Sequence, residues 1–367
     1  MELPAYLKVM ADKGASDIYL STGAQVMMKV EGKTDPLTQN PLPAGAVRQL
    51  AYSVMNDKQR AEFEKNLELD MSVGVAEVGR FRVNVFWQRG EVSMVIRHLR
   101  NDIPSIDSLG LPPVLKQLIL EPRGLVLVVG ATGSGKSTTL ASMIDHRNSH
   151  QSGHILTVED PIEYTHNHKK SVVNQREVGV DTRSYNEALR RAMREAPDVI
   201  MIGEIRDRDT MKQALTYAET GHLCISTLHA SNVDHTMRRI VNFFQEHAHK
   251  ELFMDMSMHL KAVVAQRLLK GKDGKRVVAV EVMLASPYIR DLINKGEIDG
   301  IADIMERGTE HGMKTFDQAI LELFNQDKIT REEALINANS RHNLEVKIRL
   351  AKGGLGTASD LLSIDES

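Results

Sequence analysis

The spacing of hydrophobic and polar positions divides the chain into two parts near residue 100. In the first part Phe81, Val83 and Val85 alternate with polar residues, and this period of two predicts a strand with one buried face. Strands are predicted at residues 17–20, 25–30, 69–75, 79–87 and 91–99, and helices at residues 2–13 and 44–66. Residues 1–100 are therefore expected to form a small α+β domain with an antiparallel sheet.

After Arg123 the pattern changes to short apolar strands that alternate with helices, which is typical of a largely parallel sheet. Strands are predicted at residues 124–129, 155–158, 171–177, 199–203, 223–228 and 276–284, and helices at 114–120, 138–148, 184–195, 209–220, 232–244 and 250–269. Residues 101–113, rich in proline, are the expected linker, and residues 114–345 the expected second domain. Residues 346–367 form an extension whose glycine- and serine-rich end, from Gly353, is expected to be disordered.

Composition narrows the class of protein. A chain of 367 residues suggests about two domains, and its net charge of −3 gives no general attraction to nucleic acid or anionic lipid. Cys224 is the only cysteine, which excludes an intramolecular disulfide or a multi-cysteine zinc site and fits a reducing compartment. No signal peptide and no membrane-spanning run is evident, so a cytoplasmic protein without membrane insertion is expected.

The strongest chemical signal is a phosphate loop, G-x-x-x-x-G-K-[ST], between a predicted strand and a predicted helix. Its backbone N–H groups would surround the phosphates of ATP, Lys136 would reach the β- and γ-phosphates, and Ser137 would ligate Mg²⁺. The predicted nucleotide-binding residues here are Gly130, Ala131, Thr132, Gly133, Ser134, Gly135, Lys136, Ser137 and Thr138. By itself this motif predicts nucleotide binding and leaves the use of the energy open.

Two groups of acids follow predicted strands and could complete the site. Glu204 ends the apolar strand at 199–203, where a carboxylate that orients metal or water is expected. Glu159, Asp160 and Glu163 follow the strand at 155–158, and one of them could act as base toward the attacking water. Glu163 is the candidate, because Pro161 turns the chain and could bring the third acid back to the site. Alternatively, the acids of both groups are ordinary surface carboxylates.

Histidines and arginines supply further candidates. His222 and His229 stand at the two ends of the strand at 223–228, and the carboxyl-end position favours His229 as a sensor of the γ-phosphate. Three arginines of the first domain could neutralise charge in the transition state, namely Arg80, Arg82 and Arg97. Alternatively, the histidines have a structural role, and the arginines lie on a solvated face of the sheet.

Together, these motifs resemble the secretion ATPase superfamily. The matching segments are 131–140, Glu159-Asp160-Pro161-Ile162-Glu163, Gly203-Glu204-Ile205-Arg206-Asp207, and Thr220-Gly221-His222 with Thr227-Leu228-His229. They correspond to its Walker A, Asp box, Walker B and His box. The chain is most similar to the type IV pilus retraction ATPases of the PilT/PilU family, also at Gly14-Ala15-Ser16-Asp17, Phe81-Arg82-Val83-Asn84 and Val173-Asn174-Gln175-Arg176-Glu177.

This resemblance implies an α/β protein with a PAS-like N-terminal domain followed by a RecA-like P-loop ATPase domain. Six copies would form a ring, with ATP and Mg²⁺ bound between the domains. Carried over, Glu163 is the catalytic carboxylate, Glu204 orients metal or water, His222 and His229 line the site, and one of the three arginines reaches the nucleotide across an interface.

One departure disfavours the extension ATPases, and two features near the C-terminus favour the PilU branch, the accessory retraction ATPases. The lone Cys224 disfavours the extension ATPases, which typically carry a four-cysteine zinc element. The C-terminal motif of PilT, Ala-Ile-Arg-Asn-Leu-Ile, is here Ser286-Pro287-Tyr288-Ile289-Arg290-Asp291-Leu292-Ile293, and the chain continues about 20 residues past the usual PilT end.

The expected function is thus that of an ATP-hydrolysing hexameric motor for pilus retraction. Its expected partners are a PilT-like ATPase and the inner-membrane pilus platform, at the cytoplasmic face of that membrane. Two alternatives stay open. The protein could be a nucleotide-binding scaffold that couples a second ATPase to the pilus, or a nucleic-acid motor, which the acidic balance disfavours.

Overall fold

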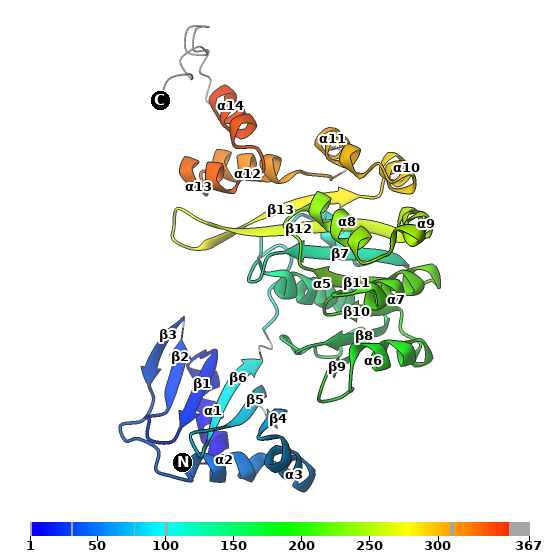
Figure 1. The fold of residues 1–367 in the computed structure, drawn as a ribbon. Coiled ribbons are helices and arrows are strands. Elements are labelled where there is room, and N and C mark those ends of the chain that lie inside the picture. The colour runs from blue at the N-terminus through cyan, green and yellow to red at the C-terminus, as the bar shows by residue number, and fades with distance from the viewer. Residues whose placement is uncertain (1, 31, 77, 100–101, 309–311, 352–367) are drawn as a thin grey trace. The chain divides into compact units, whose positions relative to one another are not determined.

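The computed structural model describes residues 2–30, 32–76, 78–99, 102–308 and 312–351 (Figure 1). The chain divides into two compact units. Unit 1 combines residues 1–103 with 156–169 and 173–195, and unit 2 holds residues 104–155, 170–172 and 196–367. The division into domains 1–100 and 114–345 stays a prediction, because the two units group segments from different parts of the chain. The expected disordered end from Gly353 lies outside the described residues.

Unit 1 contains a six-stranded sheet with the order β3-β2-β1-β6-β5-β4. Its elements are α1 (Leu3–Asp12), β1 (Asp17–Ser21), β2 (Met27–Val30), β3 (Lys33–Pro36), α2 (Ala46–Val54), α3 (Asp57–Asn66), β4 (Glu68–Val75), β5 (Gly79–Gln88) and β6 (Glu91–Leu99). All its strand pairs are antiparallel. Phe81, Val83 and Val85 are fully buried while Arg80 and Arg82 are half-buried, so the predicted alternation in β5 is confirmed.

The second sheet has seven strands in the order β13-β12-β7-β11-β10-β8-β9. From residue 114 to residue 228 the chain forms α4 (Val114–Leu118), β7 (Gly124–Gly130), α5 (Lys136–His150), β8 (Gly153–Glu159), β9 (Ser171–Glu177), α6 (Tyr185–Ala192), η1 (Met193–Glu195), β10 (Val199–Ile202), α7 (Arg208–Glu219) and β11 (Leu223–Leu228). The remainder comprises α8 (Val233–Asn242), η2 (Glu246–Ala248), α9 (His249–His259), β12 (Leu260–Lys270), β13 (Arg276–Leu284), α10 (Pro287–Lys295), η3 (Ile298–Gly300), α11 (Ile301–Arg307), α12 (Phe316–Asn325), α13 (Arg331–Asn337) and α14 (Arg341–Ala351).

β7 lies near the middle of this sheet and is parallel to β11 on one side and β12 on the other. Every residue of β7 is buried, as expected for a strand covered on both faces. β10 is in turn parallel to β11. Because parallel strands end at the same edge, the segments that follow β7, β10 and β11 start from one edge of the sheet.

Two predicted elements were wrong. The helix expected at 250–269 is α9 followed by β12, because an apolar run such as Leu260–Leu269 suits a buried strand as well as a helix, and here it pairs with β7 and β13. The helix expected at 44–66 is two helices, α2 and α3. Asn56 caps α3 in a capping box with Gln59, and this interrupts the run.

A buried carboxylate ties two helices to the second sheet. Glu281 of β13 is 5 % exposed, and its Oε2 accepts a hydrogen bond from the Val233 N–H at 2.7 Å while Oε1 accepts one from the Phe316 N–H at 3.4 Å. These N–H groups begin α8 and α12. Burial raises the pKa of Glu281 to about 7, against the hydrogen bonds and the nearby Arg267, which favour the charged form.

We predict that Glu281 makes folding less favourable as the pH rises. The unfolded chain releases this proton near pH 4.5, whereas the folded chain keeps it to about 7, so the free energy of unfolding falls across this window by about 3 kcal/mol from this group. In Glu281→Gln the urea midpoint should change less between pH 5 and 7.5 than in the wild type, while the exposed Glu246→Gln should follow the wild type. Parallel pH profiles for the wild type and Glu281→Gln would contradict this assignment.

Candidate functional site

The predicted phosphate loop follows β7 directly and leads into α5. Gly130 and Gly135 have φ values of 157° and 92°, and Gly133 has 77°, so three glycines take backbone conformations that side chains disfavour. At Gly130 an added Cβ would also lie 2.7 Å from the carbonyl oxygen of Gln266 on β12. The loop therefore needs glycine at Gly130 both for its conformation and for close contact with the neighbouring strand.

Lys136, the first residue of α5, folds back onto the loop. Its Nζ donates hydrogen bonds to the carbonyl oxygens of Gly130 at 2.9 Å and Ala131 at 3.0 Å, and the residue is 9 % exposed. These two hydrogen bonds hold the ammonium group against the loop backbone. The phosphate oxygens of a nucleotide bound at the loop would be suitable acceptors for the same group.

Two more polar atoms at the loop point to a polar ligand. Among the described residues, Ser134 Oγ and Gln266 Oε1 are buried and have no hydrogen-bond partner. Both residues line a cavity of about 550 Å³ between the loop and the hairpin of β12 and β13. Buried polar groups are normally paired, so the cavity beside the loop fits a ligand that carries donors and acceptors.

Glu204 and His229 lie together after β10 and β11. The Glu204 Oε1 and His229 Nε2 atoms are 3.1 Å apart, and Glu204 Oε2 accepts a hydrogen bond from Arg206 Nε at 2.7 Å. Burial and then the charge of Lys136 lower the pKa of His229, while Glu204 raises it. A neutral imidazole is thus favoured near neutral pH, and it needs its proton on Nε2 to donate to the carboxylate. Lys136, Glu204 and His229 form one electrostatic cluster in unit 2.

His222 is placed differently from His229. It precedes β11, and its carbonyl oxygen accepts a hydrogen bond from the N–H of Gly124, at the start of β7. Its ring Nδ1 is 3.1 Å from Thr220 Oγ1 and 3.3 Å from the Tyr217 carbonyl oxygen. His222 is therefore at the amino ends of the strands, whereas the phosphate loop is at their carboxyl ends. Within the chain, this placement does not bring His222 to the loop.

Glu163 lies in the turn after β8, in unit 1. The residue is exposed, whereas Glu159 at the end of β8 is 9 % exposed and accepts hydrogen bonds from Thr157 Oγ1 at 2.6 Å and Gln175 Nε2 at 3.1 Å. Burial raises the pKa of Glu159 to about 7 despite these hydrogen bonds. Of the two acids, Glu163 is the one accessible to a substrate.

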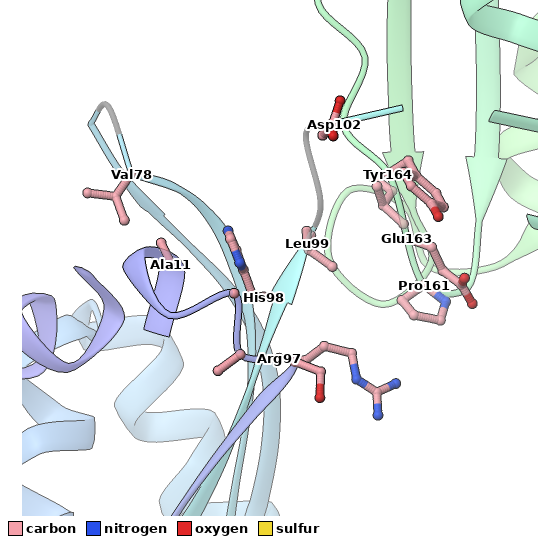
Figure 2. A pocket seen from close by; sticks show the side chains of 13 residues that line it. Ala11, Val78, Arg97, His98, Leu99, Asp102, Pro161, Glu163 and Tyr164 are labelled. Atoms are coloured by element: carbon pink, nitrogen blue, oxygen red, sulfur yellow. The ribbon is translucent and has the colours of Figure 1, made fainter. Parts of the chain in front are cut away.

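The three predicted arginines belong to β5 and β6 of unit 1. Arg97 Nε is 2.9 Å from Asp17 Oδ1, and the Arg82 guanidinium is 3.5 Å from Asp70 Oδ1. A cavity in unit 1 has a volume of about 690 Å³, and its lining includes Arg97 and Glu163 (Figure 2). Arg97 thus lines a cavity with the predicted base.

Two functional candidates escaped prediction from the sequence. Arg206 lies in one of the motifs that match the secretion ATPases, but no role was predicted for it. Its position two residues after Glu204 was the sequence signal that could have identified it. Gln175 was likewise part of a matching segment, and only the fold shows that it contacts the Glu163 turn.

No helix in the described part of the chain has the length and apolar character needed to cross a membrane.

Comparison with known proteins gives consistent matches over nearly the whole chain. The family model described as type II/IV secretion system protein matches residues 3–350. The type IV pilus ATPase PilU of Pseudomonas aeruginosa is 47 % identical over 100 % of this chain and 96 % of its own, and the type IV pilus retraction ATPase PilT of that organism is 43 % identical over 94 % and 100 %.

Solved structures agree. A crystal structure of the pilus retraction motor PilT with bound ADP superimposes with a TM-score of 0.88 at 42 % identity, covering 94 % of this chain and 99 % of that one. The Legionella pneumophila ATPase DotB gives a TM-score of 0.77 at 26 % identity, covering 91 % and 93 %. The predicted fold class, α/β with an N-terminal domain followed by a RecA-like ATPase domain, is confirmed.

We predict that Lys136 and Glu204 shift the pKa of His229 in opposite directions. Lys136→Ala should raise this pKa, because it removes a positive charge, and Glu204→Gln should lower it further, because it removes the stabilising carboxylate. Titration of isotope-labelled histidine by NMR measures both shifts, with the exposed Lys250→Ala as control. A His229 pKa that is the same in all four proteins would show that these groups do not interact.

Proposed function

The chain belongs to the type II/IV secretion system protein family, and within it to the PilT/PilU type IV pilus ATPases, and from this premise we propose that it is an ATP-hydrolysing motor that powers or assists type IV pilus retraction. The observation that carries the proposal is the phosphate loop with its buried Lys136 beside Glu204 and His229. An inactive relative would have no need to keep a cation, a carboxylate and a neutral imidazole together.

The residues around the loop suit ATP with Mg²⁺. Lys136 and the loop N–H groups would hold the phosphates, at the positively polarised N-terminus of α5. The Ser137 hydroxyl and the Glu204 carboxylate are oxygen ligands of the kind that Mg²⁺ prefers. When bound, the metal would neutralise charge on the phosphates. Glu204 is engaged by Arg206 and His229, so these two side chains orient the carboxylate.

Glu163 is the proposed base toward the attacking water. It is exposed, whereas the neighbouring Glu159 is buried, so Glu163 is the carboxylate that an attacking water can reach. Arg80, Arg82 or Arg97 would neutralise charge that develops on the phosphates. Arg97 is favoured because it lines a cavity with Glu163.

We further propose that the working form is a homohexamer and that the protein acts as an accessory retraction ATPase. The 47 % identity to PilU over the full chain supports the accessory role. Its proposed partners are a PilT-like ATPase and the inner-membrane pilus platform, and its proposed place is the cytoplasmic face of that membrane. A bound γ-phosphate would favour one conformation of the protein, and its removal by hydrolysis would end that preference.

The alternative is a nucleotide-binding scaffold that couples a partner ATPase to the pilus. Continued retraction by Lys136→Ala in cells that contain an active PilT-like partner would favour the scaffold. Loss of retraction by Glu163→Gln in such cells would favour the motor, because this variant should still bind nucleotide.

We predict that Glu163→Gln and Lys136→Ala separate turnover from binding. Glu163→Gln should lower kcat by roughly 10²–10⁴-fold, because the general base is lost, and leave the affinity for ADP unchanged. Lys136→Ala should weaken ADP binding by roughly 10–100-fold, because a charge-assisted hydrogen bond is lost. Phosphate release and calorimetric titration measure the two effects, and Lys250→Ala should match the wild type in both. Unchanged turnover in Glu163→Gln would overturn the proposed chemistry.

A further inference from the structure

The turn that carries Glu163 is fixed through its backbone. In the described part of the chain no hydrogen bond or ion pair holds the Glu163 side chain, which is exposed. Ile162, the preceding residue, is 1 % exposed and its N–H donates to Glu177 Oε2 at 3.2 Å. The Glu163 N–H lies near the Glu159 carboxylate and favours its charged form. The place of the Glu163 carboxylate therefore depends on how well the turn is anchored on both sides.

Gln175 of β9 supplies the anchor on the C-terminal side. Its Nε2 donates to the Tyr164 carbonyl oxygen at 2.9 Å and to Glu159 Oε1 at 3.1 Å. Its Oε1 accepts a hydrogen bond from the His166 N–H at 2.8 Å. One half-buried carboxamide thus joins the end of β8 to two residues of the turn that follow Glu163. Figure 2 shows Pro161, Glu163 and Tyr164 together on this turn.

We propose that Gln175 is a positioning residue for ATP hydrolysis, which holds the Glu163 turn against Glu159 and so sets the place of the Glu163 carboxylate. The inference rests on the proposed function, in which Glu163 is the base. Gln175 itself is not a catalytic residue, because it acts only through the turn.

The carboxamide of Gln175 supplies both the donor and the acceptor that its three contacts require. Two acceptors, Glu159 Oε1 and the Tyr164 oxygen, need a donor, and the His166 N–H needs an acceptor. Methionine has a similar length and supplies none of these bonds. Glutamate keeps the acceptor and, when ionised, replaces the two donor contacts by repulsion from Glu159.

The effect should fall on kcat and not on KM. A displacement of about 1 Å in a reacting group can cost roughly 10²-fold in rate. Nucleotide affinity is assigned to the phosphate loop, and Gln175 does not belong to it. We therefore expect Gln175→Met to lower kcat by about 10–100-fold, with the KM for ATP within about threefold of the wild type.

The Gln175→Glu variant adds a test based on the pH dependence of kcat, which should not change if Gln175 has only a structural role. When protonated, the carboxyl group introduced by this substitution can again donate one hydrogen bond to Glu159 or to the Tyr164 oxygen and still accept from the His166 N–H. Two carboxyl groups at this distance retain a shared proton more readily as the pH falls. The kcat of Gln175→Glu relative to the wild type should therefore rise between pH 8 and pH 6, while that of Gln175→Met should show no such recovery.

The experiment measures kcat and KM of the full chain by phosphate release at pH 6, 7 and 8. It compares the wild type, Gln175→Met, Gln175→Glu, Glu163→Gln and the control Asn174→Ala, whose side chain is exposed on the same strand. Thermal unfolding and ADP binding show whether each variant is folded, and the kcat of each variant is compared with that of the wild type at the same pH.

Support requires low kcat with near-normal KM in Gln175→Met, recovery of Gln175→Glu at pH 6, and normal kinetics in Asn174→Ala. A kcat of Gln175→Met within twofold of the wild type, or a raised KM with unchanged kcat, would overturn the role of Gln175. Unchanged turnover in Glu163→Gln would instead overturn the proposed function beneath it, so the two failures are distinguishable.

Discussion

The parallel pairing of β7 with β11 and of β11 with β10 is the constraint on which the site in unit 2 depends. It starts the phosphate loop, the segment with His229 and the segment with Glu204 from one edge of the sheet. The close contact of Gly130 with Gln266 adds β12 to this arrangement. The charge of Lys136 therefore acts on His229 and favours its neutral form. The same parallel pairing leaves His222 at the opposite ends of the strands.

In unit 1 a second arrangement serves the other chemical task. Buried or half-buried side chains of β8 and β9, Glu159, Gln175 and Glu177, hold the backbone of a turn, and the exposed Glu163 is carried by it. In the proposed function Glu163 is the base. Its place would then be set by the backbone of the turn, which Glu159, Gln175 and Glu177 hold.

Much of this could be predicted from the sequence where a local pattern has one physical meaning. The glycine pattern of the loop and the alternation in β5 are of that kind, and both predicted elements are present. The segment at 260–269 was predicted wrongly, because only its neighbours β7 and β13 decide between strand and helix. The bonds of Gln175 to the Glu163 turn could not be predicted, since they join residues whose contact depends on how β9 pairs in the sheet. By contrast, the position of His229 at the carboxyl end of β11 could be read from the sequence, because the strands of this sheet were expected to be largely parallel.

We propose that this chain hydrolyses ATP by itself. Steady-state phosphate release by the purified wild-type protein tests this at saturating ATP and Mg²⁺, in the absence of any partner ATPase, with ATP binding measured on the same preparation. We expect many turnovers per protein molecule. ATP binding without turnover would contradict hydrolysis by this chain alone and favour the nucleotide-binding scaffold.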